Sequence, residues 1–127
     1  MDEIDIQTTT NKPPRILSVC GKKLVGIILS AESGTLNTVI CCCNTVGAFI
    51  PPFLIFVRKL MQDRLLDDAP PEAQATCTGN GLSNGGAFLQ WLHFFVEHVC
   101  PNNKKKILPL LVNHESHKYY PALQFAT

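Results

Sequence analysis

Residues 88–99 read FLQWLHFFVEHV and contain the clearest structural signal in the chain. Their apolar side chains recur at helical spacing and form one stripe, made of Phe88, Trp91, Leu92, Phe95, Val96 and Val99. Ser83 or Asn84 can cap the start of this helix, and Pro101 ends it. Base stacking is an alternative role for the aromatic residues, but at this spacing we expect them in the core.

Two apolar segments rich in β-branched residues precede the helix. Residues 36–44 (LNTVICCCN) and 48–57 (AFIPPFLIFV) are separated by a short turn and predict an antiparallel hairpin. Proline cannot donate to a ladder, so Pro51 and Pro52 should lie at a strand start, a bulge or an edge. Residues 23–30 (KLVGIILS) predict one more strand.

A further apolar segment follows the helix. Residues 107–112 (ILPLLV) predict a continuous buried strand, and residues 113–117 (NHESH) form its polar end. Ser116 is a candidate cap for a short final helix over residues 119–126. The order of strand, hairpin, helix, strand and helix predicts a mixed α/β fold.

Length and composition limit the classes of function that the chain can have. The chain has 127 residues, a net charge of +1, 46% hydrophobic residues and 17% charged residues. These values fit one folded domain and exclude both a disordered tail and a chain that binds nucleic acid by bulk charge alone. We expect residues 1–14 to be an extended segment leading into the domain and residues 58–86 to be a surface connection.

The N-terminal residues MDEIDIQTTT are acidic and polar, which does not fit a secretory signal. The longest apolar stretches are also too short to span a membrane. We therefore expect no membrane partner.

The six cysteines predict buried free thiols in a reducing compartment. A disulfide framework fits poorly, because Cys41, Cys42 and Cys43 are consecutive on a predicted strand. Zinc is the alternative, but it favours paired Cys and His spacings. The only close histidine pair is His114 and His117, and no cysteine lies beside it.

Two polar clusters are candidates for chemistry. One is Asp2-Glu3 with Asp5, and the other is the NHESH segment at a predicted strand end, where α/β folds commonly place sites. Taken alone, the first also fits a solvated terminus and the second fits hydrogen-bonded structural histidines.

Together with several other motifs, these clusters resemble a known family. The motifs, in chain order, are GKK at 21–23, SGT at 33–35, GAFIPPFLIF at 47–56, APP at 69–71, FLQWLHFFVEHV at 88–99 and LPLLVNHESH at 108–117. From residue 2 to about residue 120, the chain resembles the catalytic core of the DDE superfamily endonucleases of pogo, Tigger and jerky-type transposases.

The resemblance implies an RNase H-like mixed sheet with flanking helices and cut-and-paste DNA transposition. In that family, three carboxylates hold two divalent ions, Mg²⁺ or Mn²⁺, which activate the attacking oxygen and stabilise the leaving one. Asp2 takes the place of the first catalytic aspartate and would be a metal ligand, and Glu3 follows it as in the family. The flank of the site would consist of Glu3, Asn113, His114, Glu115 and His117.

The chain also departs from the family pattern. Val112 occupies the place of the second catalytic aspartate and offers no oxygen ligand. The family's third carboxylate lies further downstream than Thr127, and its first strand ends at the position of Asp2. We therefore expect residues 1–127 to be a partial DDE-type domain, truncated at both ends, with the first strand and the C-terminal part missing. Glu115 is a weak candidate for a replacement ligand.

Several functions remain open at this stage. The first is a catalytically inactive, transposase-derived, nucleic-acid-binding domain located in the nucleus, with DNA as partner and no small-molecule substrate. The second is a domesticated DNA- or protein-binding module. Its phosphate contacts would come from Lys22 and Lys23 and from the run Lys104, Lys105 and Lys106. For this run of three lysines, a solvated loop is the alternative. An active Mg²⁺-dependent nuclease would need Asp2, Glu115 and a partner's carboxylate. A Cys-His enzyme has no local signature in the sequence.

Overall fold

The computed structural model describes residues 1–8, 20–21, 34–102, 104 and 106–127. The strand expected at residues 23–30 lies outside the described residues, as do Lys22, Lys23 and Lys105.

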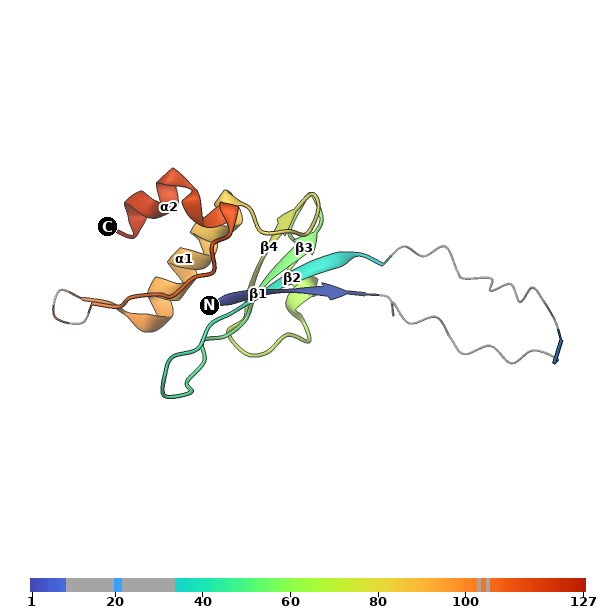
Figure 1. The fold of residues 1–127 in the computed structure, drawn as a ribbon, viewed down its shortest axis with the longest axis horizontal. Helices are drawn as coiled ribbons and strands as arrows, with labels where there is room; N and C mark the ends of the chain where they lie inside the picture. Colours follow the sequence, from blue (N-terminus) through green and yellow to red (C-terminus); the bar gives the residue numbers. More distant parts are fainter. Residues whose placement is uncertain (9–19, 22–33, 103, 105) are drawn as a thin grey trace.

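The described strands form one four-stranded mixed sheet (Figure 1). They are β1 (Asp2–Gln7), β2 (Leu36–Cys41), β3 (Phe53–Val57) and β4 (Gln74–Thr78), arranged in this order across the sheet. The β1–β2 and β2–β3 pairs are antiparallel, which confirms the predicted hairpin, and the β3–β4 pair is parallel. Pro51 and Pro52 immediately precede β3, where no ladder donor is needed.

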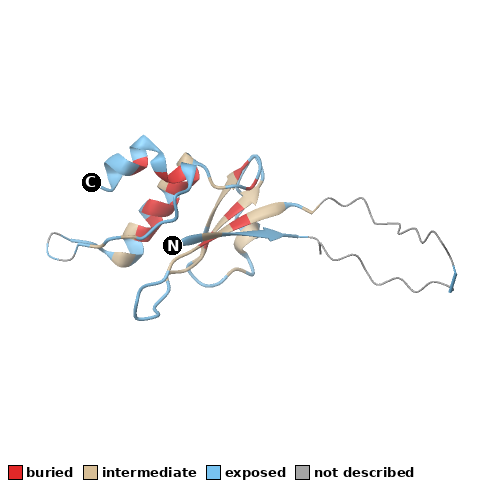
Figure 2. Cartoon of the chain, in the orientation of Figure 1, coloured by how far each residue is buried: buried red, intermediate tan, exposed pale blue. Residues whose placement is uncertain are grey.

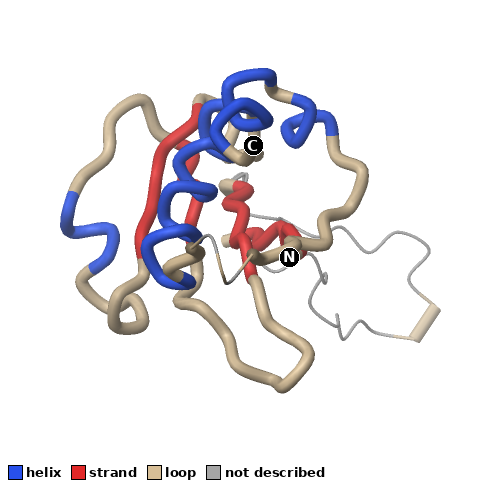
Figure 3. Tube along the Cα trace, turned by 90° about the vertical axis from the view of Figure 1, so that its left-hand side faces the viewer, coloured by secondary structure: helices blue, strands red, loops and turns tan. Residues whose placement is uncertain are grey.

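Helix α1 (Gly85–Val99) packs against one face of this sheet and supplies most of the core (Figures 2 and 3). The Asn84 side chain accepts a hydrogen bond from the Ala87 amide at 2.9 Å and caps the helix, so Asn84 and not Ser83 is the cap among the two predicted candidates. Trp91 is fully buried, and the rings of Phe94 and Phe53 lie 5.7 Å apart. The predicted stripe omitted Phe94, which is buried because the sheet covers a wider arc of the helix than one stripe.

Three short helical elements complete the fold. They are the 3-10 turns η1 (Asp63–Leu66) and η2 (Glu115–Lys118) and the helix α2 (Tyr120–Phe125). Helix α2 confirms the predicted final helix, but Tyr119 precedes it without a side-chain cap, so the cap predicted at Ser116 was wrong. Both η2 and α2 contact α1. The mixed sheet with flanking helices agrees with the expected α/β, RNase H-like class.

The continuous strand predicted at residues 107–112 is not present. Pro109 lies within this segment and has no amide hydrogen, which prevents an unbroken ladder. The amino group of Met1 donates to the Leu110 carbonyl oxygen at 3.0 Å, so the segment passes close to the start of β1 without pairing along it. Its apolar side chains are largely exposed; Leu108, for example, is 84% exposed.

Two strands lie in segments that were not predicted as strands. Strand β1 occupies part of the extended segment expected at residues 1–14 and pairs with β2 over its full length. Strand β4 lies within residues 58–86, which were expected to be only a surface connection. Its sequence, QATCT, contains no large apolar residue, so its strand conformation depends on parallel pairing with β3.

All six cysteines lie in the described part of the chain and are free thiols. Contrary to the prediction, none of them is buried; the run Cys41–Cys43 begins at the last residue of β2 and continues into the turn that follows. Within the described residues, no helix has the length and apolar character required to cross a bilayer.

Candidate functional site

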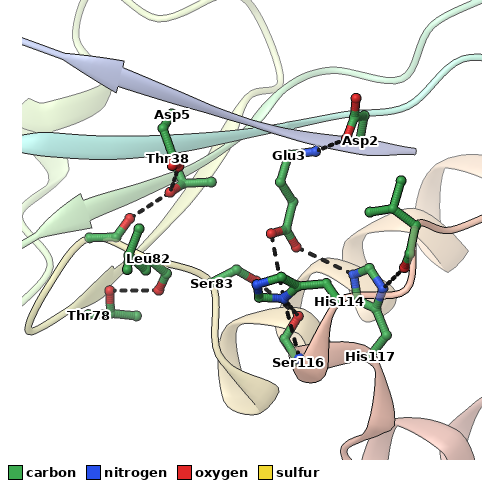
Figure 4. Close-up of polar contacts among 12 residues, drawn as sticks. Asp2, Glu3, Asp5, Thr38, Thr78, Leu82, Ser83, His114, Ser116 and His117 are labelled. Carbon is green, nitrogen blue, oxygen red and sulfur yellow. Dashed lines mark hydrogen bonds and ion pairs between the residues drawn. The ribbon is translucent and has the colours of Figure 1, made fainter.

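Strand β1 directs its first two acidic side chains to opposite faces of the sheet. Glu3 lies opposite Ile40 of β2, on the face that α1 covers, and its side chain is 13% exposed. Asp2 is exposed, and one of its carboxylate oxygens accepts a hydrogen bond from the Glu3 amide at 2.9 Å. Figure 4 shows Glu3 pointing toward two histidines and Asp2 pointing away from them. The alternation of a strand accounts for this separation.

The NHESH segment presents its two histidines on one side of a 3-10 turn. His114 precedes η2, and its Nδ1 accepts a hydrogen bond from the Ser116 amide at 3.3 Å. Residues three apart eclipse one another in a 3-10 turn, so His117 lies beside His114, with ring centroids 5.8 Å apart. The His117 ring also packs against Phe88 of α1, at a centroid distance of 4.5 Å.

Glu3, His114 and His117 therefore converge from two distant segments of the chain (Figure 4). Nε2 of His117 lies 3.4 Å from Oε1 of Glu3, and Nδ1 of His114 lies 3.9 Å from Oε2. One nitrogen or oxygen atom from each of the three residues lies within 4.8 Å of the others. The His117 side chain is 8% exposed and the His114 side chain is 46% exposed, so the cluster reaches from the interior to the surface.

The hydrogen-bond partners of His117 determine which ring nitrogen carries its proton. Nδ1 lies 2.7 Å from the Val112 carbonyl oxygen, which can only accept, so Nδ1 donates. Nε2 and Glu3 Oε1 are both buried and neither has a hydrogen-bond partner. In the neutral histidine both of these atoms are acceptors, and their proximity requires a proton or a cation between them.

A second polar group borders the cluster and holds the loop before α1 against β2. The Thr38 hydroxyl oxygen lies 2.8 Å from Asp5 Oδ1 and 2.8 Å from the Gly81 carbonyl oxygen. The hydroxyl oxygens of Ser83 and Ser116 lie 3.5 Å apart, which links the same loop to η2. These contacts fix the position of η2 relative to the start of α1.

The other site residues expected from the sequence lie outside this cluster. Val112 contributes its carbonyl oxygen to His117 and to the His114 amide, while its side chain is 49% exposed and apolar. Asn113 is exposed, and so are Lys104 and Lys106 in the turn after α1.

Glu115 does not point into the cluster. Its carboxylate pairs with the Lys118 ammonium at 2.9 Å, and its side chain is 84% exposed. The hydrogen bond from Lys118, together with the charge of that ammonium, lowers the pKa of Glu115 below its ordinary value of 4.5. With Lys118 as its partner, Glu115 takes no part in the cluster of Glu3, His114 and His117.

These residues do not fit a two-ion Mg²⁺ or Mn²⁺ site. Mg²⁺ prefers an octahedral shell of oxygen ligands, whereas the cluster supplies one carboxylate and two imidazoles. Asp2 lies on the opposite face of β1, and Val112 has no side-chain oxygen. Among the described residues, the arrangement expected from the resemblance is therefore not assembled here.

The sequence analysis placed all three cluster residues in the flank of one expected site, but it did not predict that they would form a cluster of their own. Glu3 was placed beside Asp2 as a flanking residue, whereas the structure makes Glu3 the inward carboxylate. Alternation along the strand separates Asp2 from Glu3, but it could not show which of them points inward, because Asp2 shares its face with the apolar Ile4 and Ile6, and these are exposed in the structure.

Comparison with known proteins gives one match. The family model described as DDE superfamily endonuclease matches residues 35–126, which is more than half of the chain. No curated protein and no solved structure matches the chain.

Proposed function

The chain belongs to the DDE superfamily of endonucleases, and we propose that it is a transposase-derived, nucleic-acid-binding domain without nuclease activity. The observation that carries the proposal is the valine at position 112, where the resembling pogo, Tigger and jerky-type transposases have their second catalytic aspartate. Duplex DNA is the proposed partner, and the nucleus is the proposed location.

The loss of activity follows from the chemistry of two-ion catalysis. Each carboxylate contributes both a ligand and a negative charge, and the pair of ions must stabilise the attacking and the leaving oxygen together. Val112 contributes neither, and Asp2 and Glu3 diverge across β1. The remaining donors near Val112 are the imidazoles of His114 and His117, which Mg²⁺ does not favour.

A plasmid assay tests the absence of nuclease activity. We expect no nicking of supercoiled DNA by the full chain in Mg²⁺ or Mn²⁺. Nicking that disappears in Asp2→Ala would contradict the proposal, because Asp2 is the proposed remnant of the catalytic set. Nicking that persists in Asp2→Ala would identify a contaminating nuclease.

DNA binding is tested separately. The exposed Lys104 and Lys106 are the described candidates for phosphate contacts, although a net charge of +1 allows only weak binding. We expect a mobility shift of labelled duplex DNA at low salt that weakens as salt rises and weakens in the double variant Lys104→Gln and Lys106→Gln. No shift at low salt would rule out DNA binding by the chain.

The second candidate function is a protein-binding module. The exposed apolar side chains of residues 107–112 favour it, with Leu108 at 84% and Leu110 at 77% exposure. A chain that fails to shift DNA but retains a cooperative fold would favour this second function.

A further inference from the structure

We propose that Glu3, His114 and His117 form a binding site for one divalent transition-metal ion, with Zn²⁺ as the best match. This site is distinct from the carboxylate site of the resembling transposases, because it uses neither Asp2 nor position 112 as a side-chain ligand. The proposal does not depend on whether the chain binds DNA.

The first argument is the unpartnered pair inside the cluster. Nε2 of His117 and Oε1 of Glu3 face one another at 3.4 Å, and both are buried without a hydrogen-bond partner. Buried polar atoms are nearly always satisfied, so such a pair indicates a positive group between them, either a proton on Nε2 or a metal ion. A metal ion would accept a lone pair from each atom and remove both unsatisfied positions.

The second argument is the support around His117. Histidines that bind metals usually donate their other ring N–H to a carboxylate or a backbone carbonyl, which fixes the tautomer and orientation of the ring. Nδ1 of His117 makes this contact with the Val112 carbonyl oxygen at 2.7 Å. Phe88 holds the ring from the α1 side, and Nε2 lies 3.4 Å from Oε1 of Glu3.

The third argument is the spacing of the ligand atoms. Zn²⁺ bonds to nitrogen and oxygen are about 2.0–2.2 Å, which places neighbouring ligands of a tetrahedral ion about 3.3–3.6 Å apart. The distance of 3.4 Å between His117 and Glu3 already falls in this range. The distance of 3.9 Å joins Nδ1 of His114 to the other carboxylate oxygen of Glu3, Oε2, so this imidazole, which is 46% exposed, must move inward to share an ion with His117.

His114 is the ligand that must rearrange most. Its Nδ1 now accepts from the Ser116 amide at 3.3 Å and lies 2.8 Å from the Ser116 hydroxyl oxygen. We expect His117 and Glu3 to hold the ion first and His114 to complete the protein ligands. Water would occupy the fourth position, as in zinc sites with three protein ligands.

The donor set determines the choice of metal. Two imidazoles and one carboxylate match the His₂Glu set of known zinc sites, and imidazole ligands favour Zn²⁺ over Mg²⁺. The bound ion would tie strand β1 to turn η2, two segments that are 111 residues apart between Glu3 and His114.

The test is a Zn²⁺ titration of the full chain against a chromophoric chelator, after removal of metals and with the thiols kept reduced. We expect one ion per chain bound through the cluster, with Mg²⁺ binding at least about 100-fold more weakly. Glu3→Gln and His114→Ala should each weaken Zn²⁺ binding at least about tenfold. His93→Ala is the matched control, because His93 is exposed on α1 and lies outside the cluster. The Zn²⁺ affinity of this variant should equal that of the natural chain.

The six free cysteines require a separate readout, because thiolates also bind Zn²⁺. Co²⁺ provides it, since cobalt bound to thiolate shows a charge-transfer absorption that a nitrogen and oxygen site lacks. We expect cobalt d–d bands without this thiolate absorption, and we expect them to be lost in Glu3→Gln. Circular dichroism of each variant shows whether it retains the fold.

Three results would overturn the proposal. They are the absence of Zn²⁺ binding, Zn²⁺ binding that folded Glu3→Gln and His114→Ala leave unchanged, and a cobalt spectrum dominated by thiolate absorption. His117→Ala is not used as the deciding variant, because His117 packs against Phe88 and its removal would also disturb the core.

Discussion

Helix α1 and residues 107–112 are both strongly apolar, yet the structure buries the first and exposes most of the second. Trp91 of α1 is 0% exposed, whereas Leu108 is 84% exposed. The helix satisfies its own backbone and turns one face to the sheet, so it needs only a surface to pack on. A strand instead needs a neighbouring edge with matching amides, and Pro109 interrupts any such ladder in the second segment. Apolar content therefore predicts burial only where the backbone also has partners.

The largest effect we expect comes from removing a buried side chain of α1. Trp91→Ala should lower the free energy of unfolding by about 3–5 kcal/mol, because a fully buried indole leaves a cavity. Leu108→Ala, in the exposed segment, should change this free energy by less than about 0.5 kcal/mol. Urea denaturation of the two variants measures the contrast directly. Equal losses in both would show that residues 107–112 are packed as tightly as the core.

The next largest effect is expected in the loop between β4 and α1. Gly81 has a φ of +72°, and a Cβ there would collide with the Leu36 carbonyl oxygen and the Val57 side chain. Gly81→Ala should therefore cost about 2–3 kcal/mol of unfolding free energy. Gly79→Ala is the matched control, because a Cβ at that position meets nothing within 4 Å. A loss at Gly79 as large as that at Gly81 would refute this steric account.

A smaller effect is expected at the helix cap. Asn84→Ala removes the acceptor for the Ala87 amide and should cost about 1 kcal/mol, measured by thermal or urea unfolding. Asn84→Asp retains an acceptor oxygen and should restore most of that loss. If the aspartate variant were no more stable than the alanine variant, the side-chain cap would not be what begins α1.

The smallest effect is expected at Glu115, in turn η2, which follows the second region. Lys118→Gln should raise the pKa of Glu115 toward its ordinary value of 4.5, as followed by an NMR titration. The folded-state pKa is lowered, so the contribution of the pair to stability is present above the ordinary value and is lost as pH falls through the lowered pKa. An unchanged titration in Lys118→Gln would mean that a different group, not Lys118, stabilises the carboxylate.

Local signals in the sequence were sufficient for part of the fold. The stripe of α1, its Asn84 cap and the β2–β3 hairpin each depend on residues close together in the chain, and all three were predicted. Strand β4 was not, because QATCT lacks large apolar side chains and becomes a strand only beside β3. The segment 107–112 was predicted as a strand from its apolar pattern alone, and that prediction did not take the missing donor of Pro109 into account.

In the candidate site, too, the sequence predicted local features but not long-range contacts. His114 and His117 lie within one NHESH motif, so the sequence identified them as a pair. Their contact with Glu3 depends on the register of β1 against β2 and on the packing of His117 against Phe88, and both are long-range features. The motif also did not show that Glu115 would turn outward to Lys118.

The proposed loss of nuclease activity depends on Val112, which takes the place of a catalytic aspartate in the resembling transposases and offers no ligand to Mg²⁺. Calorimetric titration of Mg²⁺ into the full chain, beside Val112→Asp and Val112→Asn, tests it most directly. We predict no binding heat for the natural chain or for Val112→Asn, and at most weak binding by Val112→Asp, because Asp2 points to the opposite face of β1 and does not join a carboxylate at position 112. Binding of Mg²⁺ by the natural chain that Asp2→Ala abolishes would contradict the account.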